Sequence, residues 1–358
     1  MTIDDVVRAK SAIRGYARRT PLVRAERLEE LFGGAEIYLK LENLQLTGSF
    51  KVRGVANKML SLSPDELAMG VTAASSGNHA QAVAYMSRLL GVKAAIVMPE
   101  NAPKSKVDGA RGYGAEVIQY GYTGGDRDLK CDELIRTRGL CLVHSHADPL
   151  VIAGHGTAAT EAVEQIAESG TLSNCASGVP QYGESGTLSN CASGVPQYGE
   201  SGSLSFDEIV LPCGAGSLTA GAAFAIKALW PSIRATAVEP AAVPRFTESI
   251  KAGKPVTVEM GSTIADGLRV SKAEPINFEL IRDNVDSLVT ADEDSIARAA
   301  REVLLRAKIL AEPSACVGVA AALAGKIDMR AGRRVCFIIS GGNADPRLLA
   351  GIISGDAV

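Results

Sequence analysis

Short apolar runs rich in β-branched residues alternate along the chain with longer stretches whose apolar residues recur at helical spacing. The short runs, which we expect to be strands, lie at residues 37–41, 70–74, 94–98, 116–120, 141–144, 208–213, 235–238, 287–290 and 334–339. The helical patterns lie at residues 78–90, 126–138, 156–168, 218–229 and 293–307. This alternation predicts an α/β fold, because parallel strands need long crossover connections and helices supply them while covering both faces of the sheet.

A perfect tandem repeat interrupts the alternation. Residues 168–183 read ESGTLSNCASGVPQYG, and residues 184–199 repeat the same letters. The unit is rich in Ser and Gly and poor in charge, and two copies are too few for a solenoid. We therefore expect residues 168–203 to form an inserted surface loop. A loop that binds a partner or another subunit is the alternative.

The composition is that of a globular protein and restricts its partners. Charged residues make up 22% and hydrophobic residues 46% of a chain of 358 residues, long enough for one large or two joined domains. The net charge of −3 argues against nucleic acid and anionic membranes as partners. No apolar run reaches the roughly 18 residues that span a bilayer. The acidic start is unlike a secretory signal, so we expect a cytoplasmic protein.

One lysine lies where a strand pattern passes into a helix pattern. Residues 39–54 read LKLENLQLTGSFKVRG, so an apolar run leads to a Thr-Gly-Ser turn and then to Lys51 near the start of a helix. The positive end of a helix dipole disfavours the ammonium form of a lysine placed there. A partly buried amine with a lowered pKa is what Schiff-base chemistry requires. A solvated surface lysine is the simpler alternative.

Two further polar turns precede helical patterns. Residues 75–79 read SSGNH, and backbone N–H groups at such a helix start suit an anionic carboxylate. Residues 212–218 read PCGAGSL, a strand end followed by a glycine-rich turn and a helix, where backbone amides can approach a phosphate closely. Taken alone, helix capping explains the first and an ordinary tight turn explains the second.

Taken together, these motifs resemble those of the fold-type II enzymes that use pyridoxal 5'-phosphate, in the branch of threonine/serine dehydratases and serine racemases. Lys51 lies in the segment that is similar to the family's cofactor-lysine motif. Further similar segments follow in the family's order: MPE at 98–100, TIADG at 263–267, EPS at 312–314 and SGGN at 340–343. The resemblance implies a two-domain fold like that of the tryptophan synthase β subunit. The large domain would comprise residues 1–63 and 148–358, and a small α/β domain residues 64–147.

The resemblance also implies roles for individual residues. Lys51 would bind the cofactor covalently and act in catalysis, and Ser76 matches the position that exchanges a proton on the opposite face in the racemases. The substrate carboxylate would bind at Ser75, Ser76, Gly77, Asn78 and His79. The cofactor would contact Phe50, Lys51, Asn78, Gly214, Ala215, Gly216, Ser217, Leu218, Gly267 and Ser340. A neutral serine at position 340, beside the pyridine nitrogen, would favour β-elimination.

The implied activity is the dehydration and deamination of a β-hydroxy-amino acid, of the threonine/serine type, to a 2-oxo acid and ammonia. A homodimer or homotetramer is the usual assembly in the family. Racemisation of serine or a related amino acid is the alternative, which Ser76 keeps open. A protein that binds pyridoxal phosphate without turnover, or recruits a partner, is the alternative from another class.

Three places depart from the family's pattern. Racemase-like members bind a divalent cation near the position of Glu239 and have a carboxylate where this chain has Arg245. A guanidinium repels a cation, so we expect no metal there and a pairing of Arg245 with Glu239. Ala215 and Ser217 replace glycines of the family's phosphate cup, so Ala215 must adopt a φ below zero.

The third departure is a set of histidines, His144, His146 and His155. We expect the first two to alternate on a strand and to face the same side. Three histidines can bind zinc. We favour the other interpretation, in which they are polar residues at the domain cleft that tune the choice of substrate or the phosphate contact.

Overall fold

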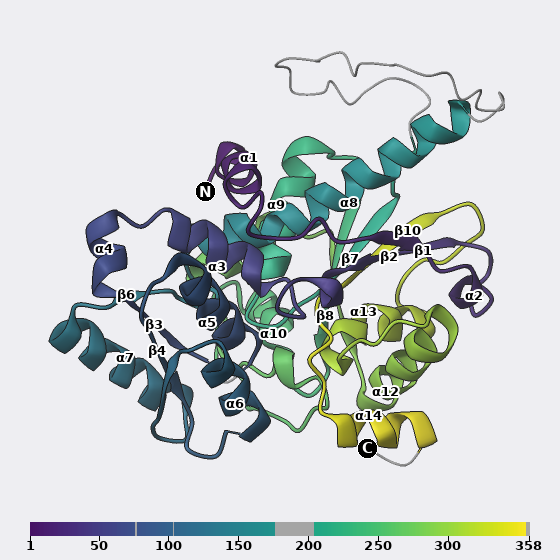
Figure 1. The fold of residues 1–358 in the computed structure, drawn as a ribbon. Coiled ribbons are helices and arrows are strands. Elements are labelled where there is room, and N and C mark those ends of the chain that lie inside the picture. Colours follow the sequence, from purple (N-terminus) through teal and green to yellow (C-terminus); the bar gives the residue numbers. More distant parts are fainter. Residues whose placement is uncertain (76, 103, 176–203, 356–358) are drawn as a thin grey trace.

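Two β-sheets, of six and of four strands, organise the residues that the structure describes (Figure 1). The structure is a computed structural model, and it describes residues 1–75, 77–102, 104–175 and 204–355. Within these residues every strand pair but one is parallel. The expected α/β class with parallel-type sheets is therefore confirmed.

The larger sheet has the strand order β1-β2-β10-β7-β8-β9. Its strands are β1 (Leu22–Arg24), β2 (Glu36–Leu41), β7 (Glu208–Pro212), β8 (Arg234–Pro240), β9 (Ser287–Ala291) and β10 (Arg334–Ile339). Strand β10 lies between β2 and β7, so segments from both ends of the chain build this sheet. The sequence pattern does not predict β1, the antiparallel edge strand, because three residues are too few to show an alternation.

Alternate side chains of the central strands pack against different helices. Ile209 and Leu211 of β7 belong to the apolar core formed with α8 (Pro149–Cys175) and α9 (Ser217–Leu229). Val210, between them, packs in the core formed with α12 (Glu293–Glu302) and α13 (Pro313–Leu323). Successive side chains of a strand point to opposite faces, so these two pairs of helices cover the two faces of the sheet.

The smaller sheet has the order β5-β4-β3-β6. Its parallel strands are β3 (Val71–Ala74), β4 (Ala94–Met98), β5 (Glu116–Gln119) and β6 (Cys141–Leu142). They all lie within residues 64–147, which we propose as the small domain, with residues 1–63 and 148–358 as the large one. Helix α3 (Lys51–Leu60) follows β2 of the larger sheet but places Val52 and Val55 in the core of the smaller one, together with α5 (Asn78–Leu90). Helix α3 therefore connects the two sheets.

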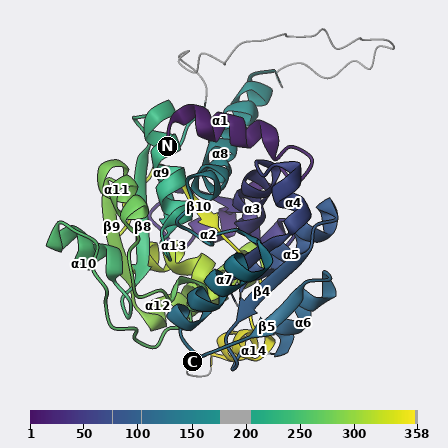
Figure 2. The same cartoon turned by 90° about the vertical axis from the view of Figure 1, so that its left-hand side faces the viewer.

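The remaining helices surround this framework. They are α1 (Ile3–Ala12), α2 (Glu26–Glu29), α4 (Pro64–Met69), α6 (Lys104–Gly112), α7 (Gly124–Arg138), α10 (Arg245–Ala252), α11 (Pro275–Asn284) and α14 (Pro346–Ser354). Helix α1 packs across α8 and α9, whereas α14 lies on the opposite side of the molecule (Figures 1 and 2). Within the described residues, no helix combines the length and apolar character needed to cross a membrane.

Helix α8 begins earlier than the helical pattern at residues 156–168 predicts. Its first residue is Pro149, a residue suited to this position because the first N–H of a helix lacks an intrahelical partner. The carboxylate of Asp148 accepts the backbone N–H groups of Leu150 and Val151. Asp148 therefore caps the helix, because its carboxylate accepts N–H groups that a preceding helical turn would otherwise bind.

Helix α8 also ends later than expected. It continues to Cys175, eight residues into the first copy of the tandem repeat. The expectation of a loop beginning at residue 168 is therefore wrong for residues 168–175. Glu168 forms an ion pair with Arg19 at 2.7 Å, which fastens this part of the helix to the N-terminal segment. The rest of the repeat, residues 176–203, lies outside the described residues.

Candidate active site

The turn that carries Lys51 is bonded to the end of β10. Lys51 is the first residue of α3, and the N–H of Phe50 donates to the carbonyl of Ser340, directly after β10, at 3.0 Å. Gly48 in the same turn has a φ of +71°, and a Cβ there would lie 2.5 Å from Oδ1 of Asn343. Glycine is therefore required. The pairing of β2 with β10 brings Ser340 beside the lysine-bearing turn.

The amine of Lys51 is held by a backbone carbonyl. Its Nζ donates to the oxygen of Ser145 at 2.8 Å and lies 5.0 Å from the centre of the Phe50 ring. Burial lowers the pKa of Lys51 to about 8. The lowered pKa agrees with the expectation from the sequence, and its cause is burial. A substantial share of this side chain is therefore a neutral, nucleophilic amine near pH 8.

The polar loop after β3 leads into the first turn of α5. The backbone N–H of Ser75 donates to the carbonyl of Val97 at 3.1 Å, and the Ser75 hydroxyl accepts the N–H of Gly77 at 3.2 Å. Asn78 is the first residue of α5, so the unpaired N–H groups of a helix start lie at this loop. Ser76, expected to exchange a proton, lies outside the described residues.

Asn78 and His79 are fixed by residues that are distant in the sequence. The Asn78 amide donates to Oε1 of Glu312 at 2.9 Å and accepts a hydrogen bond from Asn343 at 2.8 Å. His79 is 2% exposed, and its Nε2 lies 2.8 Å from the carbonyl of Val143. Burial lowers the pKa of His79 to about 3. The ring is therefore neutral, and Nε2 is the donor to that carbonyl.

Glu312, in the EPS segment at 312–314, is a site residue to which the sequence analysis assigned no role. It directly precedes α13 and is 5% exposed, and burial raises the pKa of its carboxyl to about 7. A Cβ on Gly341, next to Ser340, would lie 2.5 Å from its Oε1. The available signal is an acidic residue immediately before a long apolar helix. Its contact with Asn78 is not visible in that pattern.

The glycine-rich turn lies between β7 and α9. Gly216 has a φ of +93°, and a Cβ there would lie 2.6 Å from the Phe246 ring, so only glycine fits. Ala215 is not among the described residues with positive φ, as expected. Ser217 begins α9, and the side chain of Leu218 is buried in the apolar core. At Leu218, only backbone groups can therefore contact a ligand.

His155 connects the glycine-rich turn with the lysine-bearing turn. Its Nδ1 lies 3.1 Å from the Ser217 hydroxyl, and its ring meets the ring of Phe50 edge-on at 4.6 Å. The N–H of Gly267 donates to the Ser314 hydroxyl at 2.9 Å. A Cβ on Gly267 would lie 3.0 Å from that hydroxyl. Short contacts thus join Phe50 with Ser340 and, through His155, with Ser217.

The surroundings of Glu239 do not fit a divalent cation. Nη2 of Arg245 lies 3.6 Å from Oε1 of Glu239, and both side chains are fully buried, so the expected pairing is confirmed. The two carboxylate oxygens of Glu239 also accept the N–H groups of Phe246 and Thr247. Across the described ranges, no group of three or more His, Cys, Asp or Glu side chains is placed to hold a metal ion.

The expected strand at His144 and His146 is wrong. Strand β6 ends at Leu142, and Nδ1 of His144 accepts the backbone N–H groups of His146 and Ala147 at 3.2 and 2.8 Å. These bonds bend the chain into a turn, because side-chain hydrogen bonds to nearby backbone N–H groups compete with the hydrogen bonds between strands. The two rings pack edge-on at 4.7 Å, and burial lowers both of their pKa values. His155 lies separately, inside α8.

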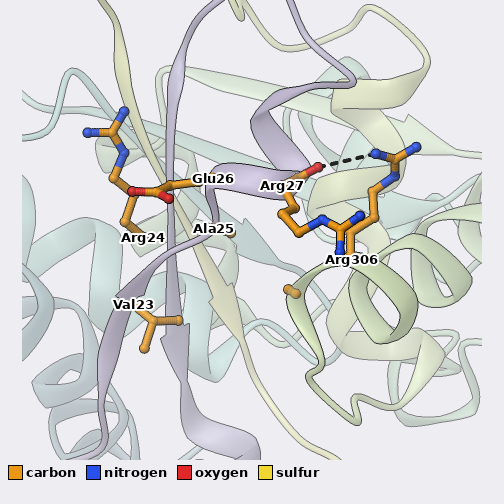
Figure 3. A pocket seen from close by; sticks show the side chains of 7 residues that line it. Val23, Arg24, Ala25, Glu26, Arg27 and Arg306 are labelled. Carbon is orange, nitrogen blue, oxygen red and sulfur yellow. Dashed lines mark hydrogen bonds between the residues drawn. The ribbon is translucent and has the colours of Figure 1, made fainter.

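A pocket of about 200 Å³ lies elsewhere, beside β1, α2 and the π-helical turn Val303–Ala307 that follows α12 (Figure 3). Arg24, Arg27 and Arg306 line it, and Nη1 of Arg306 donates to the Arg27 carbonyl at 3.3 Å. None of the expected site residues lines this pocket.

The sequence matches the family model for pyridoxal-phosphate dependent enzymes over residues 13–341. A catabolic L-threonine dehydratase of Staphylococcus aureus strain N315 is 35% identical over 355 residues, which cover 99% of this chain and 92% of that protein. The L-threo-3-hydroxyaspartate ammonia-lyase of Saccharomyces cerevisiae is also 35% identical, over 354 residues that cover 99% of this chain and 97% of that protein.

A solved structure shows a similar fold. The serine racemase of Dictyostelium discoideum superposes on this structure with a TM-score of 0.80 and 34% sequence identity, covering 96% of this chain and 99% of that one. The expected fold type, read from the motifs around Lys51, is confirmed by this likeness.

Proposed function

Because this chain belongs to the pyridoxal-phosphate dependent enzyme family, we propose that it is a lyase acting on a β-hydroxy-amino acid of the threonine/serine type. The enzyme removes the β-hydroxyl as water and the amino group as ammonia, and releases a 2-oxo acid. The observation that carries the proposal is a partly buried amine with a lowered pKa, Lys51. Its turn is bonded to Ser340 and connected through His155 to the glycine-rich turn at Ser217.

The residues of this chain fit pyridoxal phosphate. The amine of Lys51 would hold the aldehyde carbon, and the backbone of residues 214–218 with the Ser217 hydroxyl would hold the phosphate at the start of α9. Phe50, Asn78, Gly267 and Ser340 would hold the ring. Glycine is required at Gly216, where φ is +93° and a Cβ would collide with the Phe246 ring, whereas a Cβ on Gly341 would displace the Glu312 carboxylate. When bound, the cofactor supplies an electron sink for negative charge that develops at the substrate Cα.

The reaction then needs a proton acceptor and a carboxylate site. Lys51 is the acceptor for the Cα proton, since a pKa of about 8 leaves a fraction of the amine unprotonated near neutral pH. The loop of residues 75–79 is the site for the substrate carboxylate, because it presents the N–H groups at the start of α5. Glu312 and Asn343 orient Asn78 by bonding both ends of its amide.

A ketoacid-release screen tests this function. Serine, threonine, 3-hydroxyaspartate and phenylserine would each be incubated with the holoenzyme, and the 2-oxo acid and ammonia would be measured together. We expect release of both products in equal amounts from at least one substrate. A holoenzyme that releases neither from any of the four would overturn the proposal and favour the non-catalytic alternative.

Racemisation is the second candidate function. It is supported by the likeness to a serine racemase structure and by Ser76, a hydroxyl-bearing residue in the proposed carboxylate loop. Chiral analysis of L-serine incubations separates the two activities. Formation of D-serine without pyruvate would reject the lyase as the main activity.

We also propose that the enzyme is a cytoplasmic homodimer or homotetramer. The described cysteines Cys131, Cys141, Cys213, Cys316 and Cys336 are free thiols, which suits a reducing compartment. Light scattering during size-exclusion chromatography would determine the assembly. A monomeric holoenzyme with full turnover would contradict it.

A further inference from the structure

Arg245 is a buried cation without a place in the reaction just proposed. Its side chain is fully buried, and its guanidinium donates to backbone carbonyls rather than to solvent. The acceptors are the carbonyl oxygens of Gly214 at 2.9 Å, Cys213 at 2.8 Å, Val270 at 2.6 Å, Leu268 at 3.1 Å and Val243 at 3.4 Å. Such a set satisfies the rigid, multi-donor fork of arginine and could not be matched by a single ammonium group.

Four of these five acceptors belong to two segments of the proposed cofactor site, and Val243 lies outside both. Cys213 and Gly214 begin the glycine-rich turn, whereas Leu268 and Val270 follow Gly267. In a planar trans peptide, the carbonyl of one residue points away from the N–H of the next. Carbonyls that are drawn toward Arg245 therefore direct the N–H groups of Gly214 and Ala215 to the opposite side, where a phosphate would receive them.

The oxygens around Arg245 would otherwise repel one another. Carbonyl oxygens together with a carboxylate are the ligands that hard divalent cations prefer, and here the carboxylate of Glu239 lies 3.6 Å from the guanidinium. The guanidinium of Arg245 itself supplies the positive charge that balances these oxygens. Burial of the two charges costs free energy. Hydrogen bonds offset this cost: Arg245 donates to the carbonyls, and Glu239 accepts the N–H groups of Phe246 and Thr247.

We propose that Arg245 is the internal cation of the cofactor site, a positioning residue that holds the glycine-rich turn in its phosphate-binding conformation. This chain accordingly has no requirement for a divalent cation at this position. The inference rests on the proposed function only in assigning the phosphate to the turn at residues 214–218.

Cofactor affinity of substituted proteins tests the inference. Pyridoxal phosphate would be titrated into cofactor-free protein, with the visible absorbance as the readout, and thermal unfolding of the same samples would be recorded separately. We expect Arg245→Met, which keeps the length of the side chain without its charge, to weaken cofactor affinity by about 10–100-fold. Arg282→Ala, which removes an exposed arginine of α11, is the matched control and should bind the cofactor as the parent does.

Rescue distinguishes positioning from a general loss of structure. Arg245→Ala leaves a space lined by carbonyl oxygens and the Glu239 carboxylate, so millimolar methylguanidinium should restore part of its cofactor affinity. It should leave Arg282→Ala and the parent unchanged. Magnesium or calcium chloride should not alter the parent, and neither should EDTA.

Several results would overturn the inference. Parent protein that loses cofactor affinity in EDTA and regains it with magnesium depends on a metal. If Arg245→Met binds the cofactor like the parent, the hydrogen bonds of Arg245 to the backbone carbonyls are not needed. If neither the alanine nor the methionine variant folds, Arg245→Lys is the deciding variant. Unchanged cofactor affinity with a single ammonium group would exclude a role for the multi-donor guanidinium. These readouts use no substrate, so they are independent of the ketoacid screen.

Discussion

Asn78 donates its side-chain amide to Glu312 at 2.9 Å, although 234 positions separate the two residues. Asn78 begins α5, which packs on the smaller sheet, whereas Glu312 precedes α13 on the larger one. The bond therefore spans the junction of the two sheets beside Gly341. Both residues are part of the proposed site, so the relative placement of the sheets matters for its chemistry.

The titration of Glu312 should be visible in the stability of the cofactor-free protein. Burial, followed by the nearby charge of Asp266, raises the folded-state pKa of Glu312 from 4.5 to about 7. Between these values the folded state keeps a proton that the unfolded state has lost. The free energy of unfolding therefore falls as pH rises through this window, by about 3 kcal/mol from this group.

The variant Glu312→Gln does not titrate and should lack this loss. Urea unfolding at pH 5 and pH 8 measures this difference. From pH 5 to pH 8, the free energy of unfolding of the variant should rise by about 3 kcal/mol relative to that of the parent. The exposed residue Glu259 provides the control, since Glu259→Gln should follow the parent. An identical pH dependence for parent and Glu312→Gln would contradict the buried, protonated state.

Replacement of Lys51 by alanine should remove the visible cofactor band and the activity. The turnover should fall by about 10²–10⁴-fold or more, because both the covalent attachment and the base at Cα are lost. Borohydride reduction of the parent followed by peptide mass analysis should place the cofactor on Lys51. Lys58→Ala, in the same helix, should retain the band. A band in the Lys51→Ala protein would show that another lysine was modified.

The glycine-rich turn should not tolerate a side chain at Gly216. Gly216→Ala places a methyl group 2.6 Å from the Phe246 ring in a backbone conformation with φ of +93°. We expect a loss of about 1–3 kcal/mol of stability and weaker cofactor binding. Gly253→Ala is matched, since its φ is +67° and nothing lies within 4 Å of the added Cβ. Gly253→Ala should therefore cost less stability and leave cofactor affinity unchanged, and equal effects would refute a specific role of the turn.

The histidines next to Ser145 should influence the choice of substrate. The Ser145 carbonyl accepts a hydrogen bond from the Lys51 amine, so His144 and His146 flank the residue that contacts it. Burial keeps both rings neutral by lowering their pKa values, and neutral imidazoles offer polar nitrogen atoms rather than charge. We expect His146→Phe to shift the ratio of kcat/KM for 3-hydroxyaspartate and threonine by about tenfold or more in favour of threonine.

Steady-state kinetics on the two substrates measures this ratio, and a cofactor titration shows whether the site is otherwise intact. His155→Phe is not a suitable control, because His155 contacts both Ser217 and Phe50. An unchanged ratio with normal cofactor affinity would remove the histidines from substrate selection.

Much of the candidate site could be predicted because its motifs are local. Helix α5 runs from Asn78 to Leu90, the range that the apolar spacing predicts, and Lys51 begins α3 after a turn whose glycine has a positive φ. Periodicity and turn chemistry act between residues a few positions apart, so they can be read from one segment. A local pattern fails at His144, where side-chain bonds to the backbone end the strand early.

Short-range patterns in the amino-acid sequence predict the alternation of strands and helices, the lysine at a helix start and the glycine-rich turn at Gly216. Three other features arise only from the packing of distant segments: Glu312 contacts Asn78, burial lowers the pKa of Lys51, and Arg245 bonds to carbonyls of two distant segments. Burial and hydrogen bonding between remote segments depend on which strand lies beside which. That order arises from the packing of the whole chain, and no single segment contains it.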